Sequence, residues 1–148
     1  MTGSDDSGPR HRHLDAVALP DGTTVWACSF PVDGYQRERP PDFGLYLDAR
    51  WQPPWPHSHI EWPDFGLPAD QDALVNSLAA LLARARRGEN VEVGCLGGHG
   101  RTGTAIACLA ALTGVAQDPV EWVRAGYCAQ AVETDDQAEL ARRFSHRE

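Results

Sequence analysis

The chain has 148 residues, of which 42% are hydrophobic and 23% charged, a composition typical of a globular protein rather than a disordered or fibrous one. All 13 basic residues are Arg and face 21 acidic residues, and the resulting net charge of −8 disfavours nucleic-acid binding, because an acidic surface repels phosphate backbones. No apolar run is long enough to span a bilayer, and the N-terminus does not resemble a signal peptide, so we expect a cytoplasmic protein with no membrane segment.

The N-terminal half is predicted to consist of strands and loops. Residues 1–13 are polar and aperiodic, which predicts a mobile tail. Two β-prone runs, Thr23–Phe30 and Gly44–Leu47, are separated by a polar loop at Arg37–Pro41. The Trp-, Pro- and His-rich stretch Trp51–Trp62 is not expected to be helical.

From Pro68 onward the hydrophobic period becomes helical. Apolar residues recur at helical spacing at Leu74, Val75, Leu78, Leu81 and Leu82. Asp70 precedes this run as a predicted N-cap, and Gly88 follows three arginines, so the sequence predicts a helix between them.

The rest of the chain alternates a strand with helices. A β-branched strand is predicted at Val91–Cys95 and helices at Arg101–Thr113, Asp118–Ala125 and Thr134–Phe144, the last two beginning at a cap-proline pair and a capping box. Strands and helices in succession predict an α/β fold with a parallel or mixed sheet flanked by helices. We expect one domain over residues 14–148.

The most informative stretch is the glycine-rich turn after the strand Val91–Cys95. Three of the five residues after Cys95 are glycines, so the backbone can turn tightly with its N–H groups inward, and the next helix adds its dipole. Such a ring of amides binds phosphate, whose oxygens the Arg101 guanidinium can also grip. Cys95 lies at the rim of this positive ring, which favours the nucleophilic thiolate. The candidate phosphate-binding residues are Leu96, Gly97, Gly98, His99, Gly100 and Arg101.

Cys95-x5-Arg101-Thr102, between a strand and a helix, resembles the signature loop of protein tyrosine phosphatases, including the dual-specificity phosphatases. Upstream, the stretch 62–68, Trp-Pro-Asp followed by Phe-Gly-Leu-Pro, resembles the mobile acid loop of this family, and the 31 positions from Asp64 to Cys95 are similar to the family's spacing. The stretch 132–137 resembles the region that supplies a water-positioning glutamine. Together these matches cover residues 45 to 144 and imply the dual-specificity phosphatase fold.

The resemblance implies two-step phosphoryl transfer without a metal or other cofactor. Cys95 would be the nucleophile, and Asp64 would act as general acid and then as general base. Thr102 would donate a hydrogen bond to the sulfur, and Gln137 would position water. The substrate would be a phosphorylated protein or a small phosphomonoester. The expected substrate residue is phosphotyrosine. Because the short chain offers few residues for the long recognition loops that deepen the pocket in large tyrosine-specific members, we also expect a shallower site that admits phosphoserine and phosphothreonine.

One residue departs from the family pattern, and two other classes of function stay open. Many family members carry His before the nucleophile, where this chain has Gly94, so we expect weaker activation of Cys95. The departure permits a non-catalytic phosphate-binding module. Cys-x5-Arg also occurs in enzymes of arsenate reduction or sulfur transfer, but these do not call for the Trp-Pro-Asp loop that ends at Asp64.

Several other chemistry-bearing residues have ordinary structural interpretations. His57 and His59 have the spacing of a metal pair but no third ligand nearby, so we expect no metal site. Asp42 also lies in a Pro-Asp-Phe-Gly stretch, but lacks the preceding Trp. His99 is expected to be exposed at the pocket mouth, and Gln137 also fits a capping box. The remaining cysteines are predicted to be buried core residues: Cys28, Cys108 and Cys128.

Overall fold

The computed structural model describes residues 14–30, 40–63, 66–96 and 100–144. Within these ranges the elements are β1 (Leu14–Ala18), β2 (Thr24–Phe30), β3 (Phe43–Tyr46), β4 (His57–His59), α1 (Gln71–Arg86), β5 (Val91–Leu96), α2 (Gly100–Leu112), α3 (Pro119–Gly126) and α4 (Asp135–Phe144). The predicted tail 1–13 and most of the predicted loop 37–41 lie outside the described residues.

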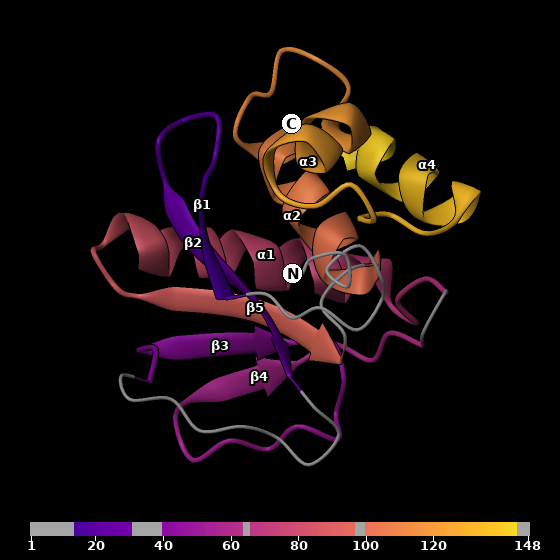
Figure 1. The fold of residues 1–148 in the computed structure, drawn as a ribbon. Helices are drawn as coiled ribbons and strands as arrows, with labels where there is room; N and C mark the ends of the chain where they lie inside the picture. Colours follow the sequence, from indigo (N-terminus) through magenta and orange to yellow (C-terminus); the bar gives the residue numbers. More distant parts are fainter. Residues whose placement is uncertain (1–13, 31–39, 64–65, 97–99, 145–148) are drawn as a thin grey trace, which may run out of the picture.

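The strands form a five-stranded mixed sheet in the order β1-β2-β5-β3-β4 (Figure 1). β1 is antiparallel to β2, whereas β2, β5, β3 and β4 are parallel to one another. The α/β prediction is therefore confirmed. α2, α3 and α4 pack against one another beside the sheet, and α2 also contacts β5 and β2. β5 lies at the centre of the sheet, between β2 and β3.

The predicted end signals of α1 are confirmed. The Asp70 carboxylate accepts a hydrogen bond from the Ala73 backbone N–H at 3.0 Å, which satisfies one of the open donors of the first turn. Gly88 has φ +94°, the left-handed conformation that ends helices and that glycine adopts without a side-chain clash.

The caps of the two C-terminal helices are confirmed as well. Asp118 accepts from the Glu121 N–H at 3.2 Å, with Pro119 in the first turn of α3. The Thr134 hydroxyl accepts from the Gln137 N–H at 3.1 Å at the start of α4. These local contacts explain why the helix boundaries could be predicted to within one or two residues.

The N-terminal strands differ more from the prediction. β1 is not anticipated by the sequence pattern, because five residues beside a polar stretch carry little periodic signal, and the strand exists through its antiparallel pairing with β2. β3 begins and ends one residue before the predicted run Gly44–Leu47. Within the non-helical stretch Trp51–Trp62, only His57–His59 forms a strand.

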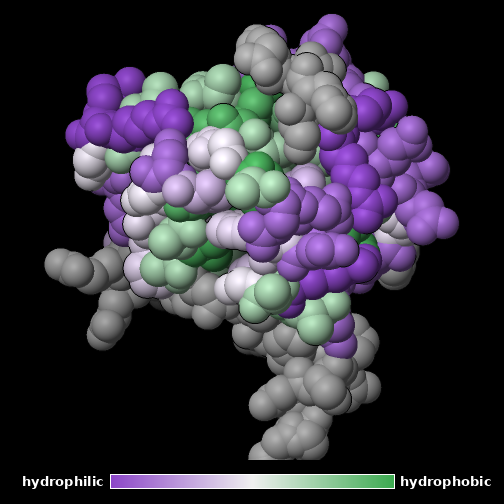
Figure 2. All heavy atoms as spheres, turned by 90° about the horizontal axis from the view of Figure 1, so that it is seen from above, coloured by the Kyte–Doolittle hydropathy of each residue, from purple (hydrophilic) through white to green (hydrophobic). Residues whose placement is uncertain are grey.

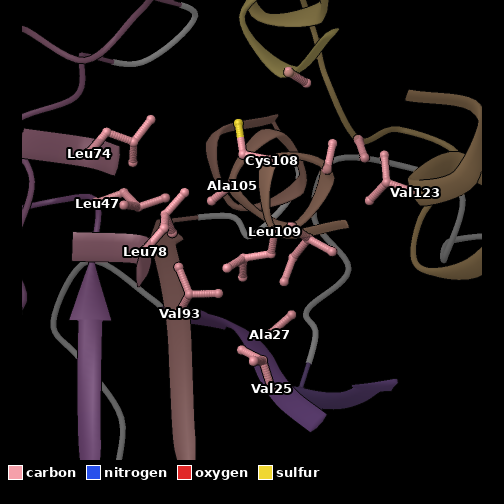
Figure 3. Packing of buried hydrophobic residues seen from close by; sticks show 14 of the residues in the cluster. Val25, Ala27, Leu47, Leu74, Leu78, Val93, Ala105, Cys108, Leu109 and Val123 are labelled. Atoms are coloured by element: carbon pink, nitrogen blue, oxygen red, sulfur yellow. The ribbon is translucent and has the colours of Figure 1, made fainter. Parts of the chain in front are cut away.

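The main core lies between one face of the sheet and the helices. Alternate residues of a strand point to opposite faces, and on β5 the odd-numbered positions Val91, Val93 and Cys95 belong to this core. Leu74 and Leu78 of α1 join the same cluster. Figure 3 shows side chains of the helices and the strands gathered in this core. Those that it labels include Val25 and Ala27 of β2, Leu47 after β3, Ala105, Cys108 and Leu109 of α2, and Val123 of α3.

A smaller cluster covers the opposite face of the sheet. Tyr46 and Cys28 are fully buried there, and Trp51 and Trp55 pack against them. The Tyr46 hydroxyl accepts a hydrogen bond from the Trp55 indole at 2.7 Å and donates one to the buried Glu92 carboxylate at 2.5 Å. This network gives the buried Glu92 carboxylate a hydrogen-bond partner, without which its burial would be costly.

The three cysteines predicted to be core residues are buried, which confirms that expectation. Burial raises the pKa of the Cys108 thiol well above its ordinary value, so this cysteine is unsuited to act as a nucleophile. Seen from above, the surface has small hydrophobic areas between larger hydrophilic ones (Figure 2). None of the described helices has the length and apolar character needed to cross a bilayer.

Candidate active site

The turn that carries the predicted chemistry joins β5 to α2. Cys95 is the penultimate residue of β5 and is 1% exposed, and α2 begins at Gly100. The intervening Gly97, Gly98 and His99 lie outside the described residues. A strand therefore precedes residues 97–99 and a helix follows them, as predicted.

Thr102 contacts the sulfur of Cys95. Its hydroxyl donates a hydrogen bond to Cys95 Sγ at 2.9 Å, and Thr102 is completely buried in the first turn of α2. A hydroxyl in this place stabilises negative charge on the sulfur, because the bond to a thiolate is charge-assisted. The predicted pairing of these two residues is present in the structure.

Arg101 is buried and lies between two segments that are distant in sequence. It is 4% exposed, and its Nη1 donates hydrogen bonds to the backbone carbonyls of Leu47 at 3.2 Å and Trp62 at 3.0 Å. Leu47 directly follows β3, and Trp62 opens the predicted acid loop. The guanidinium thus links the turn after β5 to both neighbouring loops.

Asp48 completes the surroundings of Arg101. Its carboxylate Oδ2 lies 3.6 Å from Arg101 Nη2 and also accepts from Arg50 Nη2 at 2.6 Å, while Oδ1 accepts from Arg50 Nε at 2.9 Å. The hydrogen bonds from Arg50, with the charge of Arg101 adding to them, hold the pKa of Asp48 below its ordinary value against the opposing effect of burial. Asp48 is therefore an ionised, 7% exposed partner of Arg101.

The sequence interpretation missed Asp48 and Arg50. Both follow the carboxyl end of β3, beside the carboxyl end of parallel β5, where ligands of α/β proteins commonly bind. That rule could have found them once the two strands were known to be neighbours. A cavity of about 270 Å³ opens here beside Arg101, and its other lining residues are Leu47, Ala49, Glu61, Trp62 and Pro63.

The described part of the predicted acid loop is folded back on itself. Trp62 is 3% exposed and its indole N–H donates to the Gly66 carbonyl at 2.7 Å. The Gly66 N–H donates to the Pro63 carbonyl at 3.0 Å. Asp64, the predicted general acid, lies outside the described residues.

Gln137 reaches the same loop from α4. Its Nε2 donates to the Gly66 carbonyl at 3.0 Å, and its Oε1 accepts from the Glu133 N–H at 2.8 Å and the Thr104 hydroxyl at 3.3 Å. The side chain is completely buried. The capping interpretation holds for its backbone N–H, and the water-positioning role stays a prediction.

Gly94, where the sequence departs from the family pattern, packs tightly against β2. A Cβ added at Gly94 would overlap Cys28 Sγ and would lie 2.9 Å from the Cys28 carbonyl oxygen. Cys28 is paired with Gly94 in the parallel register of β2 and β5. A larger residue before Cys95 therefore has no room in this structure.

The residues given ordinary interpretations occupy structural positions. Asp42 accepts from the Asn90 backbone N–H at 2.7 Å, far along the sheet from the turn after β5. His57 and His59 hydrogen-bond to the carbonyls of Trp55 at 2.7 Å and Trp51 at 2.8 Å. Among the residues that the structure describes, no three His, Cys, Asp or Glu side chains gather as metal ligands.

Comparison with known proteins gives a family and two curated relatives. A model described as the DSP-PTPase phosphatase domain of Swiss Army Knife proteins (PTP-SAK) matches residues 65–147. The uncharacterized protein MJECL20 of Methanocaldococcus jannaschii is 36% identical over 112 residues, covering 68% of this chain and 74% of that protein. MJ0215 of the same organism is 36% identical over 108 residues, covering 65% of each, so the match spans less than two thirds of that relative.

Solved structures share the fold. Tk-PTP in its active form has a TM-score of 0.67 at 25% identity, covering 89% of this chain and 97% of its own. Kinase associated phosphatase, with its catalytic-site cysteine replaced by serine, has a TM-score of 0.72 at 15% identity, and the match covers 91% of this chain and 94% of that protein. The protein tyrosine phosphatase TbPTP1 of Trypanosoma brucei has a TM-score of 0.70 at 17% identity, and the match covers 89% of this chain and 71% of that protein. Cys95 lies where the catalytic loop of such a fold is found.

Proposed function

The chain belongs to the DSP-PTPase phosphatase-domain family, and on this premise we propose that it hydrolyses phosphotyrosine in proteins through a phosphorylated Cys95. The observation that carries this proposal is the position of Arg101, whose Nη1 lies 3.0 Å from the Trp62 carbonyl. It joins the turn after the proposed nucleophile to the loop of the proposed acid, so two motifs that are distant in sequence share one site.

In the first step, the Cys95 thiolate attacks phosphorus, an S–P bond forms and the P–O bond to the leaving group breaks. Asp64 gives its proton to the leaving oxygen, while the turn amides and Arg101 hold the equatorial oxygens. In the second step, water attacks phosphorus, Asp64 takes a proton from it, and the sulfur leaves as a thiolate that accepts the hydrogen bond from Thr102. The sum is an ester and water giving an alcohol and inorganic phosphate, with no metal ion in the scheme.

Specificity is proposed to favour phosphotyrosine while admitting phosphoserine and phosphothreonine. Support comes from the family match, whose description, DSP-PTPase phosphatase domain, names both the dual-specificity and the tyrosine phosphatases. Phosphotyrosine, phosphoserine and phosphothreonine peptides of otherwise identical sequence test this directly. A ratio of kcat/KM values that favours phosphotyrosine, with measurable turnover of the others, is the expected result.

The central experiment is release of an aryl phosphate with EDTA and a thiol reductant present. We expect turnover by the wild type, loss in Cys95→Ser and slowing in Asp64→Asn by about 10²-fold or more. Asp42→Asn is a matched control, because Asp42 also lies in a Pro-Asp-Phe-Gly stretch but is bonded to Asn90 at the amino ends of β3 and β5, and it should retain full activity.

The alternatives predict different outcomes of the same experiment. A non-catalytic phosphate-binding module would bind vanadate without turnover, and Gly94 would then be the first residue to examine. Arsenate-dependent oxidation of thiols, or transfer of sulfur from thiosulfate, without phosphatase turnover would instead favour the other Cys-x5-Arg chemistries. Equal slowing by Asp42→Asn and Asp64→Asn would remove the support for Asp64 as the acid.

A further inference from the structure

The side-chain amide of Gln137 joins three parts of the chain that are separate in sequence. It donates to the Gly66 carbonyl in the predicted acid loop, accepts from the Glu133 N–H before α4, and accepts from the Thr104 hydroxyl in α2. Gln137 has no exposed surface, so these bonds form where water does not compete with them. The amide therefore fixes the relative positions of the groups that it joins.

The orientation of this amide is determined by its partners. The Glu133 N–H can only donate and the Gly66 carbonyl can only accept, so Oε1 must face Glu133 and Nε2 must face Gly66. In a flipped amide, Oε1 would face the Gly66 carbonyl, acceptor against acceptor, and Nε2 would face the Glu133 N–H, donor against donor. Gln137 thus presents a donor, and only a donor, to the acid loop.

The segment that precedes Gln137 is itself held in place. Val132 has φ +64°, a costly conformation for a β-branched residue, and is buried. Arg124 supports it by donating to the carbonyls of Ala131 at 2.9 Å and Val132 at 2.7 Å. A Cβ at Gly103 would overlap Ala131, so the segment packs directly on α2. Such support keeps the Glu133 N–H directed at Gln137.

The acceptor of the Gln137 bond is connected to Arg101. The Gly66 carbonyl also accepts from the Trp62 indole at 2.7 Å, and the carbonyl of the same Trp62 accepts from Arg101 Nη1 at 3.0 Å. Two donors from different elements therefore converge on one carbonyl oxygen. Its position is linked through Trp62 to the guanidinium at the proposed phosphate site.

We propose that Gln137 is a positioning residue that anchors the predicted acid loop at Gly66 and so sets Trp62 against Arg101. This inference rests on the proposed function, and it assigns Gln137 to the placement of the acid loop, which the first step, transfer of a proton to the leaving group, already requires. A glutamine that positions water acts only in the second step, on hydrolysis of the cysteinyl-phosphate. The two roles therefore affect different kinetic constants.

The test uses Gln137→Met, which keeps the length of the side chain and removes both hydrogen-bonding groups. Steady-state kinetics are measured with an activated aryl phosphate and with phenyl phosphate. The phenoxide leaving group is the more basic of the two, so its departure depends more strongly on a general acid. Because kcat/KM reports the steps up to phosphorylation of Cys95, the anchor role predicts a fall of about 10- to 100-fold for phenyl phosphate and a smaller fall for the activated ester. Gln117→Met, at an exposed position between α2 and α3, is the matched control.

A second variant keeps the test valid if Gln137→Met does not fold. In Gln137→Glu, an ionised carboxylate would repel the Gly66 carbonyl, whereas a protonated carboxyl could donate to it and still accept from the Glu133 N–H. The ratio of variant to wild-type kcat/KM should therefore rise as pH falls through the pKa of the introduced carboxyl. The same ratio for Gln117→Glu should stay constant with pH.

The outcomes separate this inference from the proposed function. An unchanged kcat/KM for phenyl phosphate in Gln137→Met overturns the inference. If kcat alone falls and cysteinyl-phosphate accumulates while kcat/KM is unchanged, the water-positioning role is identified instead. A pH-independent ratio for Gln137→Glu also overturns it. Absence of Cys95-dependent turnover in the wild type overturns the proposed function and the inference together, whereas wild-type turnover limits any failure to Gln137.

Discussion

The sulfur of Cys28 occupies the space in which a side chain at Gly94 would lie. Both residues face the smaller cluster on the sheet face opposite the helices, where Tyr46 is also buried. The residue before Cys95 is therefore limited in size by β2, a strand more than sixty positions upstream. The departure from the family pattern at Gly94 has a packing reason in this chain.

We expect Gly94→Ala to lower the free energy of unfolding by about 1–3 kcal/mol, the usual cost of overpacking a tight core. In Cys28→Ala the sulfur is absent, so adding Gly94→Ala should cost less, although the Cys28 carbonyl at 2.9 Å keeps some of the penalty. Urea unfolding of the four proteins gives the coupling energy. Additive effects would contradict direct contact as the cause.

Thr102→Val should slow hydrolysis of the cysteinyl-phosphate, because the departing Cys95 thiolate would lose its 2.9 Å hydrogen bond. A hydrogen bond to a charged group contributes about 1.5–3 kcal/mol, which corresponds to a fall of about 10- to 100-fold in kcat. Rapid-quench measurement should show a burst of released alcohol followed by slow turnover. Thr102→Ser keeps the hydroxyl and should stay near the wild type; equal losses in both variants would contradict this role.

Asp48→Asn should weaken the placement of Arg101, whose Nη2 lies 3.6 Å from the carboxylate. We expect kcat/KM to fall by about 10-fold through misplacement of the guanidinium. Arg50→Gln is the control, since it keeps the charge of Asp48 and removes only its exposed partner, and it should have a smaller effect. A larger loss in Arg50→Gln than in Asp48→Asn would show that Arg50 itself contacts the substrate.

Asp118→Ala should lower the free energy of unfolding by about 1 kcal/mol at neutral pH, because Asp118 caps α3 through the Glu121 N–H. Asp118→Asn can still cap the helix, so its smaller loss reports the ion pair with Arg142, in which Nε lies 2.8 Å from Oδ1. Urea unfolding of the three proteins measures both losses.

The ion-pair contribution of Asp118 should depend on pH. Hydrogen bonds from Arg142 hold the pKa of Asp118 below its ordinary value, against the opposing effect of burial. A lowered pKa in the folded state stabilises the protein above the unfolded pKa of about 3.9, and this contribution is lost as pH falls through the folded pKa. The difference between wild type and Asp118→Asn should therefore shrink in acid; a difference that grows there would contradict the assignment.

Features that depend on neighbours in the sequence could be predicted. Helix caps such as Asp70 and Thr134 act on backbone groups three residues away, so a local pattern specifies them. The pairing of Thr102 with Cys95 was implied by the family resemblance, and the structure places the two residues, seven positions apart, in contact. The strand β1 could not be predicted from its own five residues, since its stability comes from pairing with β2.

The sequence by itself determined the α/β class and most element boundaries, including the strand that ends after Cys95 and the helix that carries Arg101, because periodicity and capping are local properties. Only the tertiary structure decided that Asp48 accompanies Arg101 and that Gln137 reaches Gly66, 71 positions away. Such contacts depend on which strands become neighbours and on where α4 packs. Those choices are made by burial of the whole core, in which no single segment carries the information.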